Sequence, residues 1–322
     1  MQAQTFKVRV DALREEAHGV RSFSVSRLDG LPFDAYEPGA HIDVTSPSGI
    51  TRQYSLCGDP ARRDSHLFAV KKEEQSRGGS RSLHDEVNVG SELSIGAPRN
   101  LFRLEEGASE HILIGAGIGI TPLLSMAYRL VASNARFTLH YFARSETHAA
   151  FLPLLARAPF DQHVKVHFGL EREALPDALD ACLRDADVGA HVYTCGPAPF
   201  MDVVVSTAQK HLPADAIHLE RFKAEAQAQP EVSHESFDVQ IAGTGQTVRV
   251  DKNQSIVDAL ATIGIEVDTS CGEGVCGTCM VDVASGEPEH RDHCLSKAER
   301  ASNSVICCCV SRSRTPVLVL DL

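Results

Sequence analysis

The sequence lacks a long apolar run. Its longest apolar stretch, near residues 112–126, is interrupted by glycines, whereas a membrane-spanning helix needs about 20 predominantly apolar residues. The N-terminal segment MQAQTFKVRVDALREE is polar and charged, and it does not contain the apolar core of a signal peptide. These absences predict a cytoplasmic protein that has no membrane partner.

The chain is also poor in basic side chains. It carries 31 Lys and Arg against 43 Asp and Glu, which gives a formal net charge of −12. Nucleic-acid binding depends on clustered cations that neutralise phosphates, so we expect no nucleic-acid partner. An acidic surface instead suits docking to a protein that presents a basic patch.

Apolar residues, by contrast, are not scarce. Hydrophobic residues make up 43% of the 322 positions and charged residues 23%, which excludes the disordered, collagen-like and fibrous classes. A chain of this length corresponds to two or three domains.

Three regions of the sequence differ in their hydrophobic pattern. Residues 1–105 contain short alternating stretches divided by turn signals, which predicts an antiparallel β-sheet or β-barrel. Residues 106–223 alternate strands with helices, which predicts a Rossmann-like α/β domain with a parallel sheet. Residues 224–235 have few apolar side chains other than alanine and are expected to form a linker. Residues 236–322 return to short strands, with a helix that Ser255 is expected to cap.

The ten cysteines are clustered, which in a reducing compartment points to metal or redox chemistry rather than disulfides. Cys271, Cys276 and Cys279 have the spacing C-x4-C-x2-C of the plant-type [2Fe–2S] loop. Two irons bridged by two sulfides need four thiolates, and three of them come from this loop. The intervening glycines 272, 274 and 277 permit the positive φ that a loop wrapped tightly around a cluster requires. The alternatives are a structural zinc site or free buried thiols, but zinc sites usually show paired C-x2-C knuckles.

The fourth thiolate must come from Cys294 or from the triplet at 307–309. We predict Cys309, with Cys307 and Cys308 as the alternatives.

Two glycine-containing loops are candidates for nucleotide binding. The segment from Gly115 to Pro122, GAGIGITP, follows a predicted strand and opens a helix, and Thr121 is expected to cap that helix, with Pro122 in its first turn. A helix N-terminus attracts a pyrophosphate, although tight packing alone would explain the same glycines. The second loop, Cys195-Gly196-Pro197, ends another strand, and two such loops would flank one crevice. Cys195 would either line that crevice or be a buried packing thiol.

A third constellation suits a planar, phosphorylated ligand. In RQYSL, Arg52 can pair with a phosphate, Tyr54 offers a flat face, and Ser55 can donate a hydrogen bond to a ring nitrogen. The later segment Gly78-Gly79-Ser80 can form an anion-binding nest for the same phosphate. An ordinary strand and an exposed turn are the structural alternatives.

These motifs occur in the order RQYSL, GGS, GAGIGITP, CGP and C-x4-C-x2-C, and in this respect nearly the whole chain resembles the phthalate dioxygenase reductase-type family, which includes vanillate O-demethylase reductases. The resemblance implies an FMN-binding antiparallel β-barrel, an NADH-binding α/β domain and a β-grasp, plant-type ferredoxin domain. It also implies site residues. Those implied to hold FMN are Arg52, Gln53, Tyr54, Ser55, Ala69, Val70, Lys71, Gly79 and Ser80. Those implied to line the nucleotide site are Gly117, Thr121, Arg144, Cys195, Gly196 and Pro197, with Phe222 over or near the flavin.

Further family features refine the prediction. The segment CVSR at 309–312 matches the family and supports Cys309 as the fourth cluster ligand. Arg144 is followed by the neutral Ser145 and would tolerate a 2′-phosphate, but NADH remains the expected donor. Ser55 and Cys195 are the two residues expected to act in catalysis.

The implied function is that of the reductase component of a Rieske-type aromatic-ring oxygenase or demethylase system. A nicotinamide gives two electrons together and a [2Fe–2S] cluster accepts one, so a flavin must lie between them. The expected order is NADH, FMN, [2Fe–2S] and then the terminal oxygenase, with the reductase as a monomer. The alternatives are a stand-alone NAD(P)H flavin reductase with small or promiscuous acceptors and a ferredoxin-like carrier with vestigial flavin and nucleotide sites.

Overall fold

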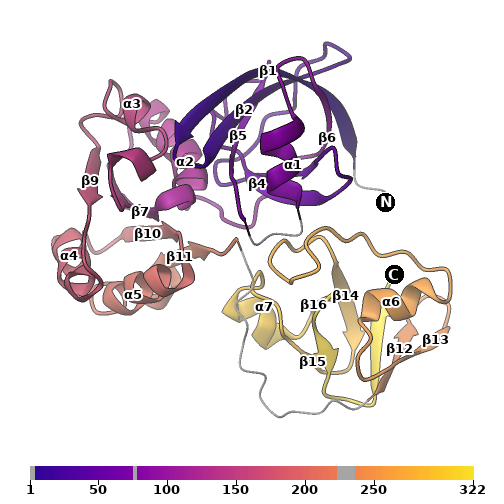
Figure 1. Ribbon diagram of the computed structural model, residues 1–322. Helices are drawn as coiled ribbons and strands as arrows, with labels where there is room; N and C mark the ends of the chain where they lie inside the picture. Colours follow the sequence, from indigo (N-terminus) through magenta and orange to yellow (C-terminus); the bar gives the residue numbers. More distant parts are fainter. Residues whose placement is uncertain (1–3, 75–77, 223–235) are drawn as a thin grey trace. The chain divides into compact units, whose positions relative to one another are not determined.

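The computed structural model describes residues 4–74, 78–222 and 236–322 (Figure 1). The chain divides into two compact units, one ending at Glu220 and the other beginning at Arg221, and each is described by itself below. The predicted linker 224–235 lies outside the described residues. Among the helices of the described ranges, none has the length and apolarity that a membrane crossing requires.

The first sheet of the N-terminal unit is a six-stranded antiparallel barrel. Its strands are β1 (Thr5–Ala17), β2 (Val20–Arg27), β3 (His41–Thr45), β4 (Thr51–Ser55), β5 (His66–Lys71) and β6 (Glu92–Gly96). They are arranged in the order β4-β3-β6-β1-β2-β5, and a bridge between Leu56 and Phe68 joins the two edges. The alternation in TFKVRV directs Phe6, Val8 and Val10 inward, as a half-buried strand requires. Helix α1 (Gly79–Glu86) follows β5.

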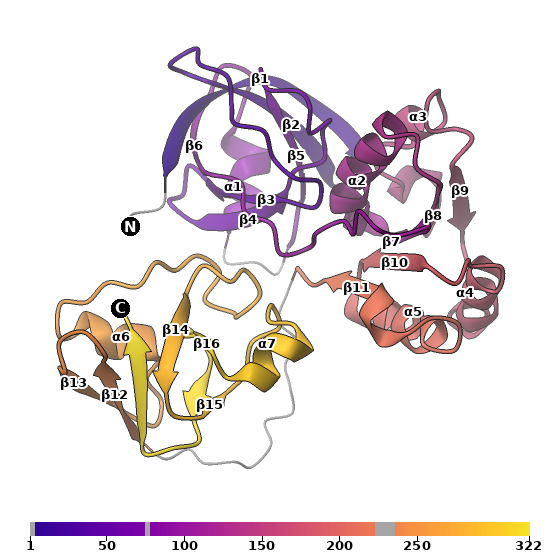
Figure 2. The same ribbon diagram turned by 180° about the vertical axis from the view of Figure 1, so that it is seen from behind.

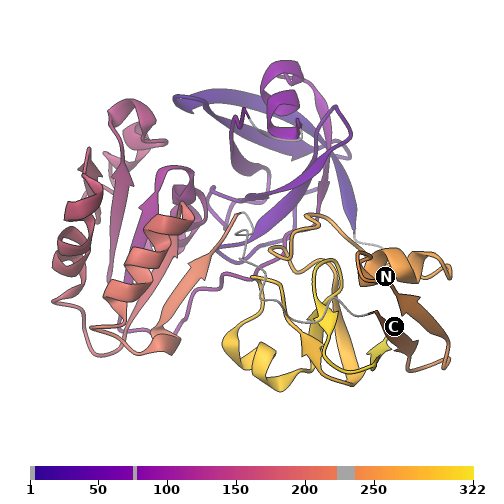
Figure 3. The same ribbon diagram turned by 60° about the horizontal axis from the view of Figure 1, so that its bottom comes forward.

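The second sheet has five parallel strands. They are β7 (Glu110–Ala116), β8 (Phe137–Ala143), β9 (Val164–Phe168), β10 (Ala190–Cys195) and β11 (Ile217–Glu220). Their order is β11-β10-β7-β8-β9, so the direction of winding reverses between β7 and β10. The central strand β7 is buried along its whole length, because helices cover both faces of the sheet (Figure 3). The helices are α2 (Ile120–Ala132), α3 (Leu152–Leu155), α4 (Leu175–Leu183) and α5 (Ala198–Ala208).

The start of α2 differs from the prediction. Thr121 does not cap the helix, because α2 begins at Ile120 and the preceding residue, Gly119, already has helical dihedral angles. A capping residue needs non-helical dihedrals, whereas here a 3-10 turn over Gly117–Gly119 runs directly into the helix. The Thr121 hydroxyl instead donates to the carbonyl of Ile118 at 2.9 Å. Pro122 does lie in the first turn, as predicted.

The barrel and the parallel sheet share a hydrophobic core. Val20, Cys57 and Ala69 of the barrel belong to the same buried cluster as the apolar face of α2. The Gly39 amide also donates to the buried Ser125 hydroxyl of α2 at 2.9 Å. The two sheets therefore form one packed body, which fixes how their loops meet.

The C-terminal unit is a mixed five-stranded sheet. Its strands are β12 (Phe237–Ile241), β13 (Thr247–Val250), β14 (Met280–Ser285), β16 (Val305–Cys307) and β18 (Val317–Asp321), in the order β13-β12-β18-β14-β16. Strands β12 and β18 are parallel, and a small second sheet pairs β15 (Pro288–Glu289) with β17 (Arg312–Ser313). Helices α6 (Ile256–Ala261) and α7 (Lys297–Ser302) flank the main sheet on opposite sides (Figure 2). Ser255 caps α6 by accepting from the Asp258 amide, as predicted.

The three architectures agree with the predicted antiparallel barrel, α/β domain and β-grasp domain.

Candidate functional site

The first group of predicted residues lies where β4 passes the start of α1. Gly78 has φ 109°, and α1 begins at the next residue. A Cβ on Gly79 would lie 3.1 Å from Ile50 Cγ2 and 3.6 Å from Arg52 Cγ, so the first turn of α1 packs against the stem of Arg52. This turn contains no acidic residue. A guanidinium next to a helix N-terminus fits a phosphate group, because both carry positive charge.

The next residues of β4 face in different directions. Tyr54 is half-buried, and its ring stacks on Phe68 with centroids 5.8 Å apart and an interplanar angle of 28°. Burial raises the pKa of Tyr54 to about 12, so its hydroxyl stays protonated. Gln53 donates to Asp43 on β3 at 3.0 Å, which commits its side-chain amide to the barrel. A planar ring could therefore rest against Tyr54 but not against the Gln53 amide.

The predicted residues of β5 offer backbone rather than side chains. Ala69 and Val70 are buried in the two cores, and the Val70 carbonyl lies 2.8 Å from His84 Nε2. The exposed Lys71 forms an ion pair with Glu73 at 3.1 Å. In the described residues, the only strand pairing between the β4 segment and β5 is the Leu56–Phe68 bridge, so the edge of β5 beyond Phe68 has no strand partner on that side.

The two loops predicted for the nucleotide come together at the carboxyl ends of adjacent strands. Gly115 and Cys195 are direct neighbours across β7 and β10. A Cβ on Gly119 would lie 2.2 Å from the Cys195 carbonyl oxygen, and one on Gly196 would lie 3.0 Å from the Ala116 Cβ. The contact therefore requires glycine at 119 and leaves little room for a side chain at 196. It lies at the switch point of the sheet, where open α/β sheets bind ligands.

The other residues predicted for the nucleotide lie at the same carboxyl edge of the sheet. Gly117 has φ 55°, and its carbonyl accepts a hydrogen bond from the Tyr141 hydroxyl at 3.0 Å. Arg144 is exposed directly after β8, on the same carboxyl edge of the sheet, and Pro197 immediately precedes α5.

Glu220 and His41 were missed by the sequence analysis, and they join the barrel to the parallel sheet. The Ser55 hydroxyl donates to Glu220 Oε2 at 3.4 Å, and His41 Nδ1 lies 3.8 Å from Glu220 Oε1. Glu220 pairs with Cys195 across the ends of β10 and β11. Burial raises the pKa of Glu220 to about 8. Burial, with a smaller contribution from Glu220, also holds the pKa of Cys195 well above its usual value, so Cys195 is a neutral thiol.

Phe222 is 39% exposed and lies two residues beyond β11, in the C-terminal unit. Its position over the flavin stays a prediction.

The cysteine loop has the backbone that its spacing predicts. Cys271, Cys276 and Cys279 are each at most 7% exposed. The Glu273 amide donates to Cys271 Sγ at 3.3 Å, and the Thr278 amide donates to Cys276 Sγ at 3.4 Å. The three loop glycines at 272, 274 and 277 have φ of 67°, 69° and 67°. Backbone donors aimed at sulfur suit thiolates that carry the charge of a cluster.

The triplet places its three cysteines differently around this loop. Cys309 lies within hydrogen-bonding reach of both Cys271 and Cys279. Cys307 reaches Cys279, but its sulfur also lies 3.1 Å from that of Cys294. Hydrogen bonds from Cys307 and Cys309 lower the pKa of Cys279, which favours its thiolate form. Cys308 is fully buried in the core. The donor set around the loop thus fits the cluster, and Cys309 contacts more of the loop than Cys307 does.

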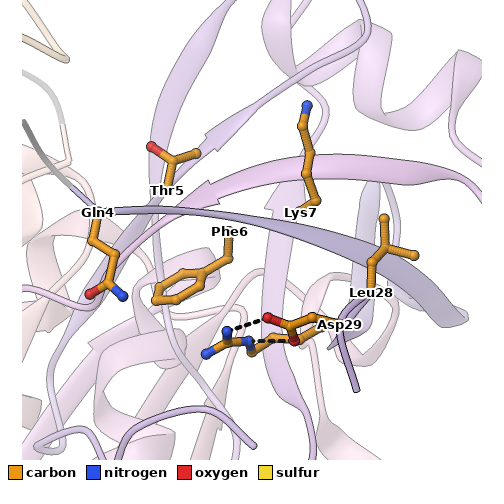
Figure 4. Close-up of a pocket in the computed structure, with 7 residues that line it drawn as sticks. Gln4, Thr5, Phe6, Lys7, Leu28 and Asp29 are labelled. Carbon is orange, nitrogen blue, oxygen red and sulfur yellow. Dashed lines mark hydrogen bonds and ion pairs between the residues drawn. The ribbon is translucent and has the colours of Figure 1, made fainter. Parts of the chain in front are cut away.

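A cavity of about 300 Å³ lies elsewhere on the barrel, at the start of β1 (Figure 4). The Arg27 guanidinium lies 4.6 Å from the Phe6 ring centre and pairs with Asp29. None of the predicted cofactor residues lines this cavity, so it is separate from the site described above. Its lining residues are Gln4, Thr5, Phe6, Lys7, Arg27, Leu28 and Asp29.

Comparison with known proteins shows the family to which the chain is related. Residues 239–314 match the family described as 2Fe-2S iron-sulfur cluster binding domain, and residues 97–216 match the N-terminal domain of the dimethylamine monooxygenase subunit DmmA-like family. The chain is 44% identical over 313 residues to vanillate O-demethylase oxidoreductase of Pseudomonas putida, covering 96% of this chain and 97% of that protein.

Two solved structures are similar along the whole chain. One is phthalate dioxygenase reductase, described as a modular structure for electron transfer from pyridine nucleotides to [2Fe–2S]; the TM-score is 0.71, the identity 33%, and the coverage 99% of this chain and 98% of that one. The other is an intact type IV self-sufficient cytochrome P450 monooxygenase, with a TM-score of 0.89, 35% identity, and coverage of 99% of this chain and 41% of that one. The chain therefore belongs to the phthalate dioxygenase reductase-type family of flavin iron–sulfur oxidoreductases, together with the vanillate O-demethylase oxidoreductases.

Proposed function

We propose that this chain is the reductase component of a Rieske-type aromatic-ring oxygenase or demethylase, and that it passes electrons from NADH through FMN and [2Fe–2S] to the terminal oxygenase. The observation that carries the proposal is the contact between Ser55 and Glu220 beside Cys195. This contact joins β4, the strand proposed to bind the flavin, to the end of the parallel sheet at which we propose that the nucleotide binds. Hydride transfer needs such a junction, because the two reacting rings must be held against each other.

When bound, the nicotinamide supplies an electron pair as hydride, the flavin divides the pair, and the cluster carries single electrons. The chain's residues bind and orient these groups. Arg52 and the first turn of α1, with Gly79 and Ser80, would hold the flavin phosphate. Tyr54 and the open edge of β5 would lie along the flavin ring. The crevice between Gly117 and Cys195 would hold the dinucleotide.

The two buried ionisable groups at the junction, Glu220 and Cys195, are both in their neutral forms. Because the pKa of Glu220 is raised to about 8, its carboxyl group is protonated in most molecules at pH 7. Cys195 is a thiol for the same physical reason. The junction therefore presents hydrogen-bonding groups without a fixed negative charge, and Ser55 would orient a ring nitrogen by turning its single hydroxyl proton from Glu220 toward the ring.

Four cysteines would hold the cluster: Cys271, Cys276, Cys279 and Cys309. The amides that point at Cys271 and Cys276 would stabilise its negative charge. The finer parts of the proposal are NADH rather than NADPH, FMN rather than FAD, and a monomer with domain limits at 1–105, 106–223 and 236–322. The net charge of −12 supports a basic docking patch on the oxygenase.

A stopped-flow comparison tests the proposed relay. In Cys276→Ser, NADH should still reduce the flavin and a dye such as ferricyanide within a few-fold of wild type. Reduction of a vanillate-type oxygenase should be lost, because the single-electron exit is removed. Ser206→Ala serves as a control, because Ser206 is an exposed residue on α5 and the change does not alter any cysteine. Equal loss of both activities would refute the proposed order, and unchanged oxygenase reduction would mean that electrons leave from the flavin. Acid extraction in the same preparation identifies the released flavin.

A further inference from the structure

Two imidazoles and one thiol gather on the α/β domain, apart from the residues assigned above. His140 on β8 and His167 on β9 face each other, with 3.1 Å between His140 Nδ1 and His167 Nε2. With Cys182 Sγ, on α4, they form a group whose three ligand atoms all lie within 4.8 Å of one another. Their functional role is not explained by the binding of flavin, nucleotide or cluster.

The group formed by His140, His167 and Cys182 lies between the sheet and α4. His140 is only 4% exposed, whereas His167 and Cys182 are half-buried. The His167 ring stacks on Phe142, with centroids 4.3 Å apart and an interplanar angle of 9°. Leu179, also on α4, is fully buried in the adjoining core. Packing therefore holds three polar side chains at the edge of an apolar layer, and two of them remain accessible to solvent.

We propose that His140, His167 and Cys182 form a binding site for one Zn²⁺ or a related borderline-soft divalent cation. Imidazole nitrogen and thiolate sulfur are the donors that zinc prefers, and no carboxylate joins the group to favour Mg²⁺ or Ca²⁺. Zn–N bonds of about 2.0–2.1 Å and a Zn–S bond of about 2.3 Å place tetrahedral ligand atoms roughly 3.3–3.6 Å apart. The observed spacings are close enough for side-chain rotation to complete the site, with water as the fourth ligand.

The charge of the three groups suits a cation. Burial lowers the pKa of His140 to about 4 and also lowers that of His167, so both rings are neutral at pH 7 and offer lone pairs. Burial raises the pKa of Cys182 to about 11, so binding would release one proton for each zinc bound. The exposed Lys165 on β9 is the charged residue that acts on all three groups. It favours the Cys182 thiolate, and its exposed side chain can turn toward solvent as a cation enters.

A second histidine pair in the same sheet provides a matched control. His191 Nδ1 and His218 Nε2 lie 2.8 Å apart, but within the described ranges no third cysteine, histidine or carboxylate completes a group with them. If a close histidine pair were sufficient for zinc binding, both pairs would bind it. The proposal requires that only the pair with Cys182 does so.

The test is a zinc titration of the complete protein, with flavin and iron fully loaded, against a chromophoric chelator. We expect one tight site per chain and, by zinc-edge X-ray absorption, two nitrogens at about 2.0–2.1 Å and one sulfur at about 2.3 Å. Cys182→Ser should raise the zinc Kd at least about 100-fold, since loss of even a second-shell partner costs about 10–100-fold. His191→Asn should leave the Kd within about twofold. Cys294→Ser, which removes a sulfur from a separate cluster of three potential ligands, should do the same.

The proposal is overturned if Cys182→Ser binds zinc as tightly as wild type, or if the sulfur signal disappears only in Cys294→Ser. A measurement on the wild-type protein avoids any effect of substitution on folding. Alkylation of Cys182 by iodoacetamide, followed by peptide mass spectrometry, should slow markedly when zinc is added, because a metal-bound thiolate is shielded. An unchanged alkylation rate at saturating zinc would also overturn the site.

Discussion

Replacing Arg52 with alanine tests the phosphate site at the junction of β4 and α1. The stem of Arg52 packs against the first turn of α1, as the 3.6 Å between its Cγ and a Cβ built on Gly79 shows. Within the described residues its guanidinium donates to the Thr51 carbonyl. That neutral contact leaves its charge available to an anion.

The expected loss follows from the type of contact. A hydrogen bond to a charged group contributes about 1.5–3 kcal/mol, so Arg52→Ala should weaken flavin binding roughly 10–150-fold. The flavin affinity of Arg52→Lys should fall between those of Arg52→Ala and the wild type, because lysine keeps the charge but lacks the planar guanidinium group. The assay dilutes the loaded protein and follows the fluorescence of released flavin until it reaches equilibrium.

Arg103→Ala is the matched control. The Arg103 side chain is 75% exposed and lies 3.8 Å from Glu37. The substitution therefore removes the same charge from the barrel surface without changing a residue that packs on α1. Flavin affinity should not change in this variant. The phosphate assignment is refuted if Arg52→Ala binds flavin within twofold of wild type, or if Arg103→Ala loses as much affinity, which would indicate a general effect of charge.

Three further changes probe the cluster, the junction and the crevice. Cys309→Ser should lose the visible absorbance of the cluster, whereas Cys307→Ser should keep it. The reverse result would assign Cys307 as the fourth ligand instead of Cys309. Because burial raises the pKa of Glu220 from 4.5 to about 8, the free energy of unfolding should decrease as pH rises between these values; only the unfolded chain releases this proton there. In Glu220→Gln the urea midpoint for flavin release should lose that part of its pH dependence, and an unchanged pH profile would contradict the raised pKa. Gly119→Ala places a Cβ 2.2 Å from the Cys195 carbonyl and should lower kcat/KM for NADH roughly 10–100-fold, with flavin content unchanged; normal kinetics would argue against the crevice.

Local patterns predicted much of the site. The spacing of the cysteine loop, the positive φ of its glycines and the Ser255 cap all depend on neighbours within a few residues, and the structure has each of them. The Thr121 cap was wrong for an equally local reason. A glycine-rich segment shortly before a threonine suits both a 3-10 turn and a true cap, and the sequence pattern does not distinguish their dihedral angles.

The junction between the sheets could not be predicted in this way. Ser55 and Glu220 are 165 positions apart, and their contact depends on how two sheets pack rather than on any spacing. One signal was present: Glu220 is a carboxylate at the end of a strand, two residues before the predicted flavin residue Phe222. His41 gave no such signal, because a histidine at the start of an alternating strand is ordinary.

The core shared by the barrel and the parallel sheet has a consequence for how such chains can be rearranged. A gene rearrangement that separated them would expose Val20, Cys57 and Ala69 together with one face of α2. The C-terminal unit, in contrast, encloses its own cluster of buried residues. The barrel and the parallel sheet are therefore expected to be inherited, or fused to other proteins, as one unit. Recombination should do least damage to the fold after Glu220 rather than near residue 105.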